Sequence, residues 1–145
     1  MPNAPAKKCL LGFDFGTAKI GIATGQTVTN TATPLNIISA SDGVPNWITL
    51  AAILSEWQPD LIIVGLPLNM DDSESELSRR ARKFARRLQG RFNIDALMVD
   101  ERLTSREAKG AWLKSGGRVL DKIDDIAAAL ILQSWLDNPQ LGDKP

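Results

Sequence analysis

Apolar positions in the first forty residues predict three consecutive strands. An apolar run over residues 9–15 is followed by a short turn at residues 16–19 and by a second run, residues 20–24, which glycines interrupt. Two such runs around a tight turn are typical of a β-hairpin. A third extended stretch covers residues 33–39, before a polar turn at residues 41–43. The chain is therefore expected to open with an antiparallel meander.

The rest of the chain alternates between helical and strand patterns. Helical spacing of apolar residues predicts one helix from Pro45, a first-turn proline, to residue 57, and a second over residues 74–89. Continuous apolar runs at residues 61–64 and 94–99 predict buried strands. Alternation of this kind is typical of parallel strands with covering helices.

Two more helices are predicted near the end of the chain, over residues 104–113 and 123–136. The element order then predicts an α/β fold with a mixed five-stranded sheet, an antiparallel meander followed by parallel strands, flanked by helices. A length of 145 residues, of which 43% are apolar, suits one domain over residues 1–145. Flexible ends are expected at about residues 1–7 and 138–145.

Composition narrows the chemistry and the compartment. Histidine and tyrosine are absent, which excludes a histidine-dependent triad, a histidine-ligated zinc site and a tyrosyl nucleophile. Cys9 is the only cysteine, so no intrachain disulfide is possible. No signal-like segment precedes it, and the longest apolar run is far shorter than a membrane span. We expect a cytoplasmic protein in which carboxylates carry any acid–base or metal chemistry.

Acidic residues stand at three predicted element ends. Asp14 ends the first strand, Asp100 and Glu101 end the last one, and Asp124 and Asp125 open the final helix. Ligands of mixed α/β sheets gather at the carboxyl ends of the central strands. One of Asp100 and Glu101 should point towards the same region as Asp14. Only one of Asp124 and Asp125 can face these carboxylates, because neighbouring positions on a helix point about 100° apart.

Three clustered carboxylates repel one another unless a cation compensates their charge. A hard divalent ion such as Mg²⁺, or Mn²⁺, would do so and could activate water for displacement at phosphorus. The same acids also have structural explanations. An acid at a strand end often forms a turn or caps a helix, and paired acids favour a helix's first turn.

Basic residues gather on the predicted helix at residues 74–89 and just beyond it. The run is a candidate surface for a phosphate backbone, and equally a solvated helix face that the helix dipole favours. Net charge is zero, so only a local patch can mark a nucleic-acid partner. The run comprises Arg79, Arg80, Arg82, Lys83, Arg86, Arg87 and Arg91. Candidate phosphate contacts are Arg79, Arg82, Arg86, Arg102 and, in the first turn, Gly16 and Thr17. Arg102 could instead pair with an acid.

Four motifs in order resemble the YqgF-type family, whose members are assigned as Holliday junction resolvases and as nucleases processing the 5′ end of pre-16S ribosomal RNA. The motifs are Phe13-Asp14-Phe15-Gly16-Thr17 with Ile20-Gly21, Ile63-Val64-Gly65-Leu66-Pro67-Leu68-Asn69, Asp100-Glu101-Arg102-Leu103-Thr104, and Ile123-Asp124 leading into Ala127-Ala128. The resemblance implies a ribonuclease-H-like fold and a divalent-metal phosphodiesterase site. Its catalytic and metal-binding acids fall by motif position on Asp14, Glu101 and Asp124, a choice that spacing alone could not make.

The resemblance implies a nucleic-acid substrate and no membrane. Structured RNA, with pre-16S ribosomal RNA preferred, is the first expectation, and branched DNA is the alternative; ribosomal particles are further candidate partners. We expect a monomer or a weak homodimer. Two other functions stay open: the Asp-x-Gly-Thr turn also resembles the phosphate loop of two-lobed actin-like and sugar-kinase ATPases, and the same fold could serve as a non-catalytic nucleic-acid-binding module.

Overall fold

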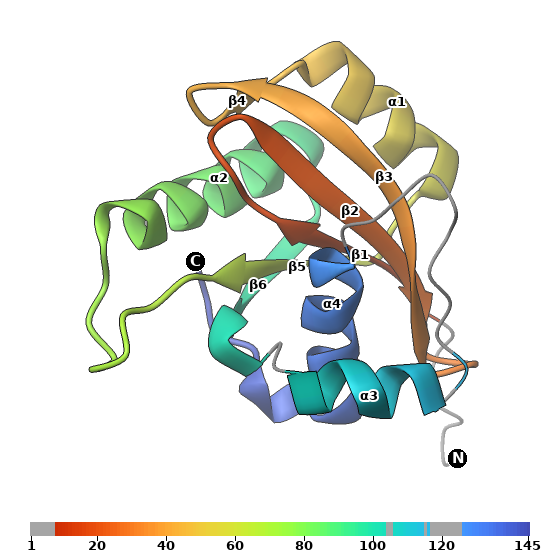
Figure 1. The fold of residues 1–145 in the computed structure, drawn as a ribbon. Coiled ribbons are helices and arrows are strands. Elements are labelled where there is room, and N and C mark those ends of the chain that lie inside the picture. The colour runs from red at the N-terminus through yellow and green to blue at the C-terminus, as the bar shows by residue number, and fades with distance from the viewer. Residues whose placement is uncertain (1–7, 104–105, 115, 117–125) are drawn as a thin grey trace.

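A computed structural model describes residues 8–103, 106–114, 116 and 126–145. Across these residues six strands form one sheet in the order β4-β3-β2-β1-β5-β6 (Figure 1). The strands are β1 (Cys9–Asp14), β2 (Lys19–Gln26), β3 (Thr31–Ser41), β4 (Val44–Pro45), β5 (Leu61–Leu66) and β6 (Asp95–Asp100).

The sheet is mixed, as the pattern predicts. β1 to β4 pair antiparallel in sequence order, whereas β5 pairs parallel with both β1 and β6. The prediction of five strands is wrong, because the two-residue β4 was not recognised. Asp42 and Gly43 both have positive φ, which makes the tight two-residue turn into β4. Pro45 belongs to that strand, and the helix after it is capped by Asn46.

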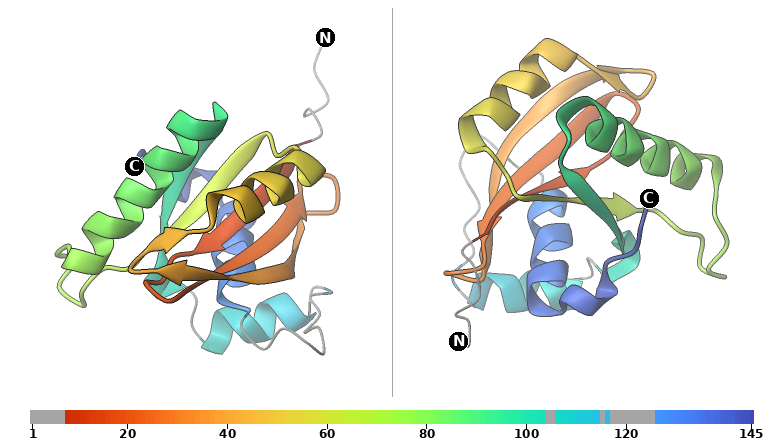
Figure 2. Two further views of the ribbon diagram at one scale, coloured as in Figure 1. Left: turned by 90° about the horizontal axis from the view of Figure 1, so that it is seen from above. Right: turned by 180° about the vertical axis from the view of Figure 1, so that it is seen from behind.

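Helices cover both faces of the sheet (Figure 2). The helices α1 (Trp47–Trp57) and α2 (Glu76–Phe92) lie on one face, which we call the α2 face. The helices α3 (Arg106–Lys114) and α4 (Ala127–Asp137) lie on the other, the α4 face. Two short 3₁₀ helices, η1 (Glu101–Leu103) and η2 (Pro139–Leu141), complete the described elements. No helix in the described ranges combines the length and apolar character that a membrane span requires.

Residues of β1 alternate between the two cores. Leu11 and Phe13 join the core under α1 and α2, whereas Leu10 joins the core under α4. Gly12 also faces α4: a Cβ there would lie 2.8 Å from the Leu132 Cβ and 3.0 Å from the Ala128 carbonyl oxygen. The α4 backbone at Ala128 therefore packs directly on the sheet.

Asp143, within the end expected to be flexible over residues 138–145, pairs with the sheet. Met98 of the edge strand β6 donates its N–H to the Asp143 carbonyl at 2.6 Å and accepts from the Asp143 N–H at 2.9 Å. An edge strand exposes backbone groups that need such partners, which explains the contact. The described part of α4 begins at Ala127, and the predicted start of this helix at Ile123 lies outside the described residues.

Candidate active site

Asp14 stands at the carboxyl end of β1, as predicted, and is half-buried. Strand alternation sends its side chain to the α4 face, the face that Gly12 also meets. One residue before Asp14, Phe13 pairs with Val64 of β5. The next residue of β5 is Gly65, so Asp14 and Gly65 stand side by side, about 4.8 Å apart at the normal strand spacing.

Glu101 reaches the same place from the other side. It directly follows β6 as the first residue of η1, and its Oε2 atom lies 3.6 Å from the point where a Cβ on Gly65 would stand. That point also lies 2.5 Å from Cδ1 of Ile131 in α4. Gly65 therefore separates Asp14 from Glu101 without placing a side chain between them, and two carboxylates share one face at one edge of the sheet.

Asp100 is turned away from this pair. Its carboxylate accepts from the Arg102 backbone N–H at 2.9 Å and from the Arg102 guanidinium at 2.7 to 3.1 Å. Hydrogen bonding by Arg102 lowers the pKa of the Asp100 carboxyl below its ordinary value. Of the two acids at this strand end, Glu101 is the one that approaches Gly65.

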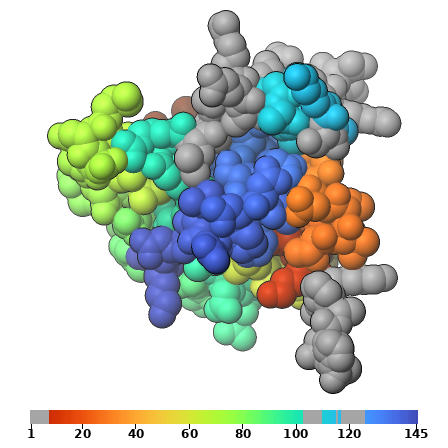
Figure 3. Space-filling model, turned by 90° about the horizontal axis from the view of Figure 1, so that it is seen from below, coloured from red at the N-terminus to blue at the C-terminus, as the bar shows by residue number. Residues whose placement is uncertain are grey.

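Arg102 is occupied by partners within the chain. Besides Asp100, it donates to the Asn69 and Met70 carbonyl oxygens at 3.0 and 3.4 Å and to the Asp72 carboxylate at 2.6 Å. These bonds to Asp100 and Asp72 raise the pKa of Arg102 further above its already high value. Arg102 thus fastens η1 to the loop between β5 and α2, which projects from the surface in yellow-green in Figure 3. Pairing with acids, one of its two predicted roles, is the one seen.

The first turn has a structural reason for its glycine. A Cβ on Gly16 would lie 2.5 Å from the Lys19 carbonyl oxygen, so the turn admits no side chain there. The Thr17 carbonyl accepts the Gly43 N–H at 2.9 Å, which joins the β1–β2 turn to the β3–β4 turn.

Arg79, Arg82 and Arg86 do not lie together with the carboxylates. Arg79 pairs with Glu76 at 2.9 Å, and Arg82 pairs with Glu74 at 2.8 Å and bonds the Lys144 carbonyl. Arg86 bonds the Pro145 carbonyl at 3.0 Å.

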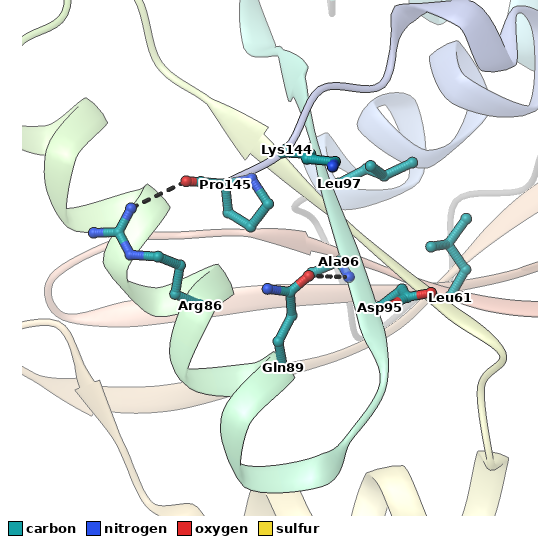
Figure 4. A pocket seen from close by; sticks show the side chains of 8 residues that line it. All are labelled: Leu61, Arg86, Gln89, Asp95, Ala96, Leu97, Lys144 and Pro145. Atoms are coloured by element: carbon teal, nitrogen blue, oxygen red, sulfur yellow. Dashed lines mark hydrogen bonds between the residues drawn. The ribbon is translucent and has the colours of Figure 1, made fainter.

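Arg86 lines a hollow of about 570 Å³ at the amino ends of β5 and β6, the far end of these strands from Glu101 (Figure 4). The dashed lines there mark the bonds of Arg86 to Pro145 and of Gln89 to the Ala96 N–H. Neither Asp14 nor Glu101 lines this hollow.

The third predicted acid, Asp124, lies outside the described residues, as does Asp125. Among the residues that the structure describes, no three acids or cysteines come close enough to hold a metal ion. Sequence reasoning missed the part that Gly65 plays. The available signal was a glycine at the end of the buried run of residues 61–66, where strands rarely place glycine without a close neighbour.

Known proteins resemble this chain in sequence and in fold. A family model described as Holliday junction resolvase, RuvX, matches residues 8–138. A proposed pre-16S rRNA nuclease of Saccharophagus degradans is 58% identical over 129 residues, which are 87% of this chain and 91% of the relative. A protein of the same description from Haemophilus ducreyi is 56% identical over 132 residues, 89% of this chain and 96% of the relative.

Solved structures agree on the fold. Thermus thermophilus RuvC in complex with a Holliday junction substrate matches with a TM-score of 0.63 at 14% identity, over 95% of this chain and 99% of that one. The fowlpox virus resolvase with Holliday junction DNA matches with a TM-score of 0.55 at 17% identity, over 90% and 98% of the two chains. The predicted ribonuclease-H-like fold is confirmed. The chain therefore belongs to the RuvX family, the family described as Holliday junction resolvases.

Proposed function

We propose that this chain is a divalent-metal-dependent nuclease of the cytoplasm that processes the 5′ end of pre-16S ribosomal RNA. The observation that carries the proposal is the pair of carboxylates, Asp14 and Glu101, beside Gly65 on one face of the sheet. The matched family model and the curated relatives support hydrolysis of phosphodiester bonds.

The donors suit a hard divalent cation. Asp14 and Glu101 offer only oxygen atoms, which Mg²⁺ and Mn²⁺ prefer. We propose Asp124, two residues before Ile126, as the third ligand, on its motif position. When bound, such an ion lowers the pKa of a water molecule and offsets the charge on the phosphate.

The chain's own residues orient the reactants. Carboxylate oxygens of Asp14 and Glu101 accept hydrogen bonds from the attacking water and aim its oxygen at phosphorus. A new phosphorus–oxygen bond forms as the bond to the leaving oxygen breaks; the attacking water gives up one proton to solvent, and the leaving oxygen takes one from solvent. Ile131 of α4 packs against Gly65 and keeps solvent from the rear of the site.

Pre-16S rRNA is preferred because curated relatives at 56–58% identity bear that description. A Holliday junction is the second candidate, favoured by the description of the matched family. An ATPase is disfavoured, because such enzymes need two lobes, and single resolvase chains match 90–95% of this chain.

Depletion of the protein in its host tests the proposal. We expect 16S rRNA with unprocessed 5′ ends, restored by the wild-type gene and by Asp95→Asn, which removes an exposed acid at the amino end of β6. Asp14→Asn should not restore processing. Normal 5′ ends after full depletion would contradict the proposed substrate.

Cleavage assays with purified protein distinguish the two candidate substrates. Wild type and Asp14→Asn are given, with Mg²⁺ or Mn²⁺, a pre-16S fragment and a four-way DNA junction. Cleavage of the junction alone would transfer the proposal to DNA, and cleavage of neither would favour the non-catalytic binding module.

A further inference from the structure

The cations of α2 form two stripes that differ in their hydrogen-bond and ion-pair partners. Arg79, Arg82 and Arg86 are held by acids or by carbonyls of the C-terminal residues. Arg80, Lys83 and Arg87, spaced i, i+3 and i+7, form a second stripe on another side of the helix. The sequence alone does not distinguish the two stripes.

The second stripe borders a small hollow. Together with Phe15, Asp42, Gly43, Val44 and Phe84, it lines a space of about 60 Å³. This volume is far below the several hundred Å³ of a usual small-molecule site, and it suits a group of a few atoms.

The walls of the hollow are held in place. Arg80 donates to the Asp42 carboxylate at 2.9 Å, and the ring centroids of Phe15 and Phe84, which also line the hollow, lie 5.2 Å apart. The β3–β4 turn, which contributes Gly43, comes up beside α2 in Figure 2 (left).

The hollow has an excess of positive charge. Three cations line it against one carboxylate, Asp42, which Arg80 already pairs. Lys83 and Arg87 are exposed, and within the described part of the chain neither forms a hydrogen bond or an ion pair. A small hollow with two uncommitted cations suits an anion, and arginine suits the oxygens of a phosphate best.

The hollow stands beside the proposed active site. Phe15 directly follows Asp14, and Gly43 is hydrogen-bonded to Thr17 in the turn after β1. The carboxylates and the hollow thus occupy the same end of β1, on opposite faces of the sheet. A nucleic-acid strand cleaved on one face can reach the other by crossing this edge.

We propose that the hollow binds a phosphate of the substrate strand, next to or near the phosphate that is cleaved. This inference rests on the proposed nuclease function. It assigns positioning of the strand to Lys83 and Arg87, and it removes that role from the Arg79, Arg82 and Arg86 stripe.

Salt dependence of binding tests the inference. Asp14→Asn protein, which should not cleave, is titrated with a 12-nucleotide single-stranded RNA over a range of salt. Each phosphate contact on single strands contributes about 0.7 to the slope of log K against log salt, so adding Lys83→Gln and Arg87→Gln should reduce the slope by about 1.4. The matched control adds Arg79→Gln and Arg86→Gln, the same charge change on the other stripe, and should alter the slope by less than about 0.5.

A second measurement locates the contact. Neutral methylphosphonates are placed one at a time along the RNA. Protein with the native cations on both stripes should bind RNA more weakly when the methylphosphonate stands at one or two particular positions. The Lys83→Gln/Arg87→Gln protein should bind those modified RNAs as tightly as it binds the unmodified RNA. Equal slopes for the two double variants, or unchanged methylphosphonate positions, would overturn the hollow as a phosphate site while the Asp14-dependent cleavage stands. Absence of RNA binding by every protein, with no cleavage by wild type, would overturn both proposals.

Discussion

The two faces of the sheet are packed in opposite ways near Asp14. On the α2 face, Phe13 and Phe15 fill the space with rings that lie 5.7 and 5.2 Å from the ring of Phe84. On the α4 face, the corresponding strand positions are Gly12 and Gly65, and residues of α4 occupy the room that these glycines leave. Aromatic filling makes a closed core, whereas glycine lets a helix approach the strands and leaves carboxylates beside them.

This difference explains why chemistry is expected on one face only. Asp14 stands between Phe13 and Phe15, so one step along β1 changes the environment from a closed aromatic core to the carboxylate site. A slip of one residue in the β1 register would turn the acid into the aromatic core. On the α2 face, cations are confined to the rim, where Lys83 and Arg87 remain exposed.

The largest effect should come from removing one carboxylate of the α4 face. Asp14→Asn or Glu101→Gln should lower kcat for phosphodiester cleavage roughly 10³-fold, because several kcal/mol of transition-state stabilisation are lost. Asp100→Asn, at the same strand end but turned to Arg102, should keep at least about a tenth of the rate. Single-turnover cleavage with matched metal concentrations measures all three. Equal losses of cleavage rate in Asp100→Asn and Glu101→Gln would contradict the assignment of the chemistry to the α4 face.

The close approach of α4 should give the next largest effect. Gly12→Ala places a Cβ 3.0 Å from the Ala128 carbonyl and 2.8 Å from Leu132 Cβ, and neither backbone can move freely. We expect the free energy of unfolding to fall by about 1–3 kcal/mol, as overpacked cores do. Gly90→Ala in α2 meets nothing within 4 Å and should raise it by up to about 1 kcal/mol, because alanine favours helices. Urea unfolding compares the two variants, and a neutral Gly12→Ala would contradict direct packing of α4 on β1.

The contrast also marks what the sequence could predict. Local signals located the strand end at Asp14, the parallel order of β5 and β6, and the helix that carries the cations, because each depends on neighbours in the chain. Partners distant in sequence could not be predicted: Lys144 and Pro145 accept from Arg82 and Arg86, some sixty residues earlier. β4 was missed because two residues give no periodicity. The motif position favours Glu101 over Asp100, a choice that stays a prediction; in the structure Asp100 is bonded to Arg102.

The smallest predicted effect concerns the Arg102 bond that keeps Asp100 away from Glu101. Arg102 lowers the pKa of Asp100 in the folded state, so the pair stabilises the fold above the unfolded pKa of about 3.9 and loses this contribution as pH falls through the lower folded pKa. Carbon-detected NMR titration should place the Asp100 pKa below that of a model peptide. Arg102→Gln should move it upward and make the loop at Asn69 and Met70 a better protease site, because its anchor at their carbonyls is lost. If the titration of Asp100 and the digestion of the loop were both unchanged in Arg102→Gln, the order of this loop would not depend on Arg102 and would rest on bonds such as those between Asn69 and Ser73.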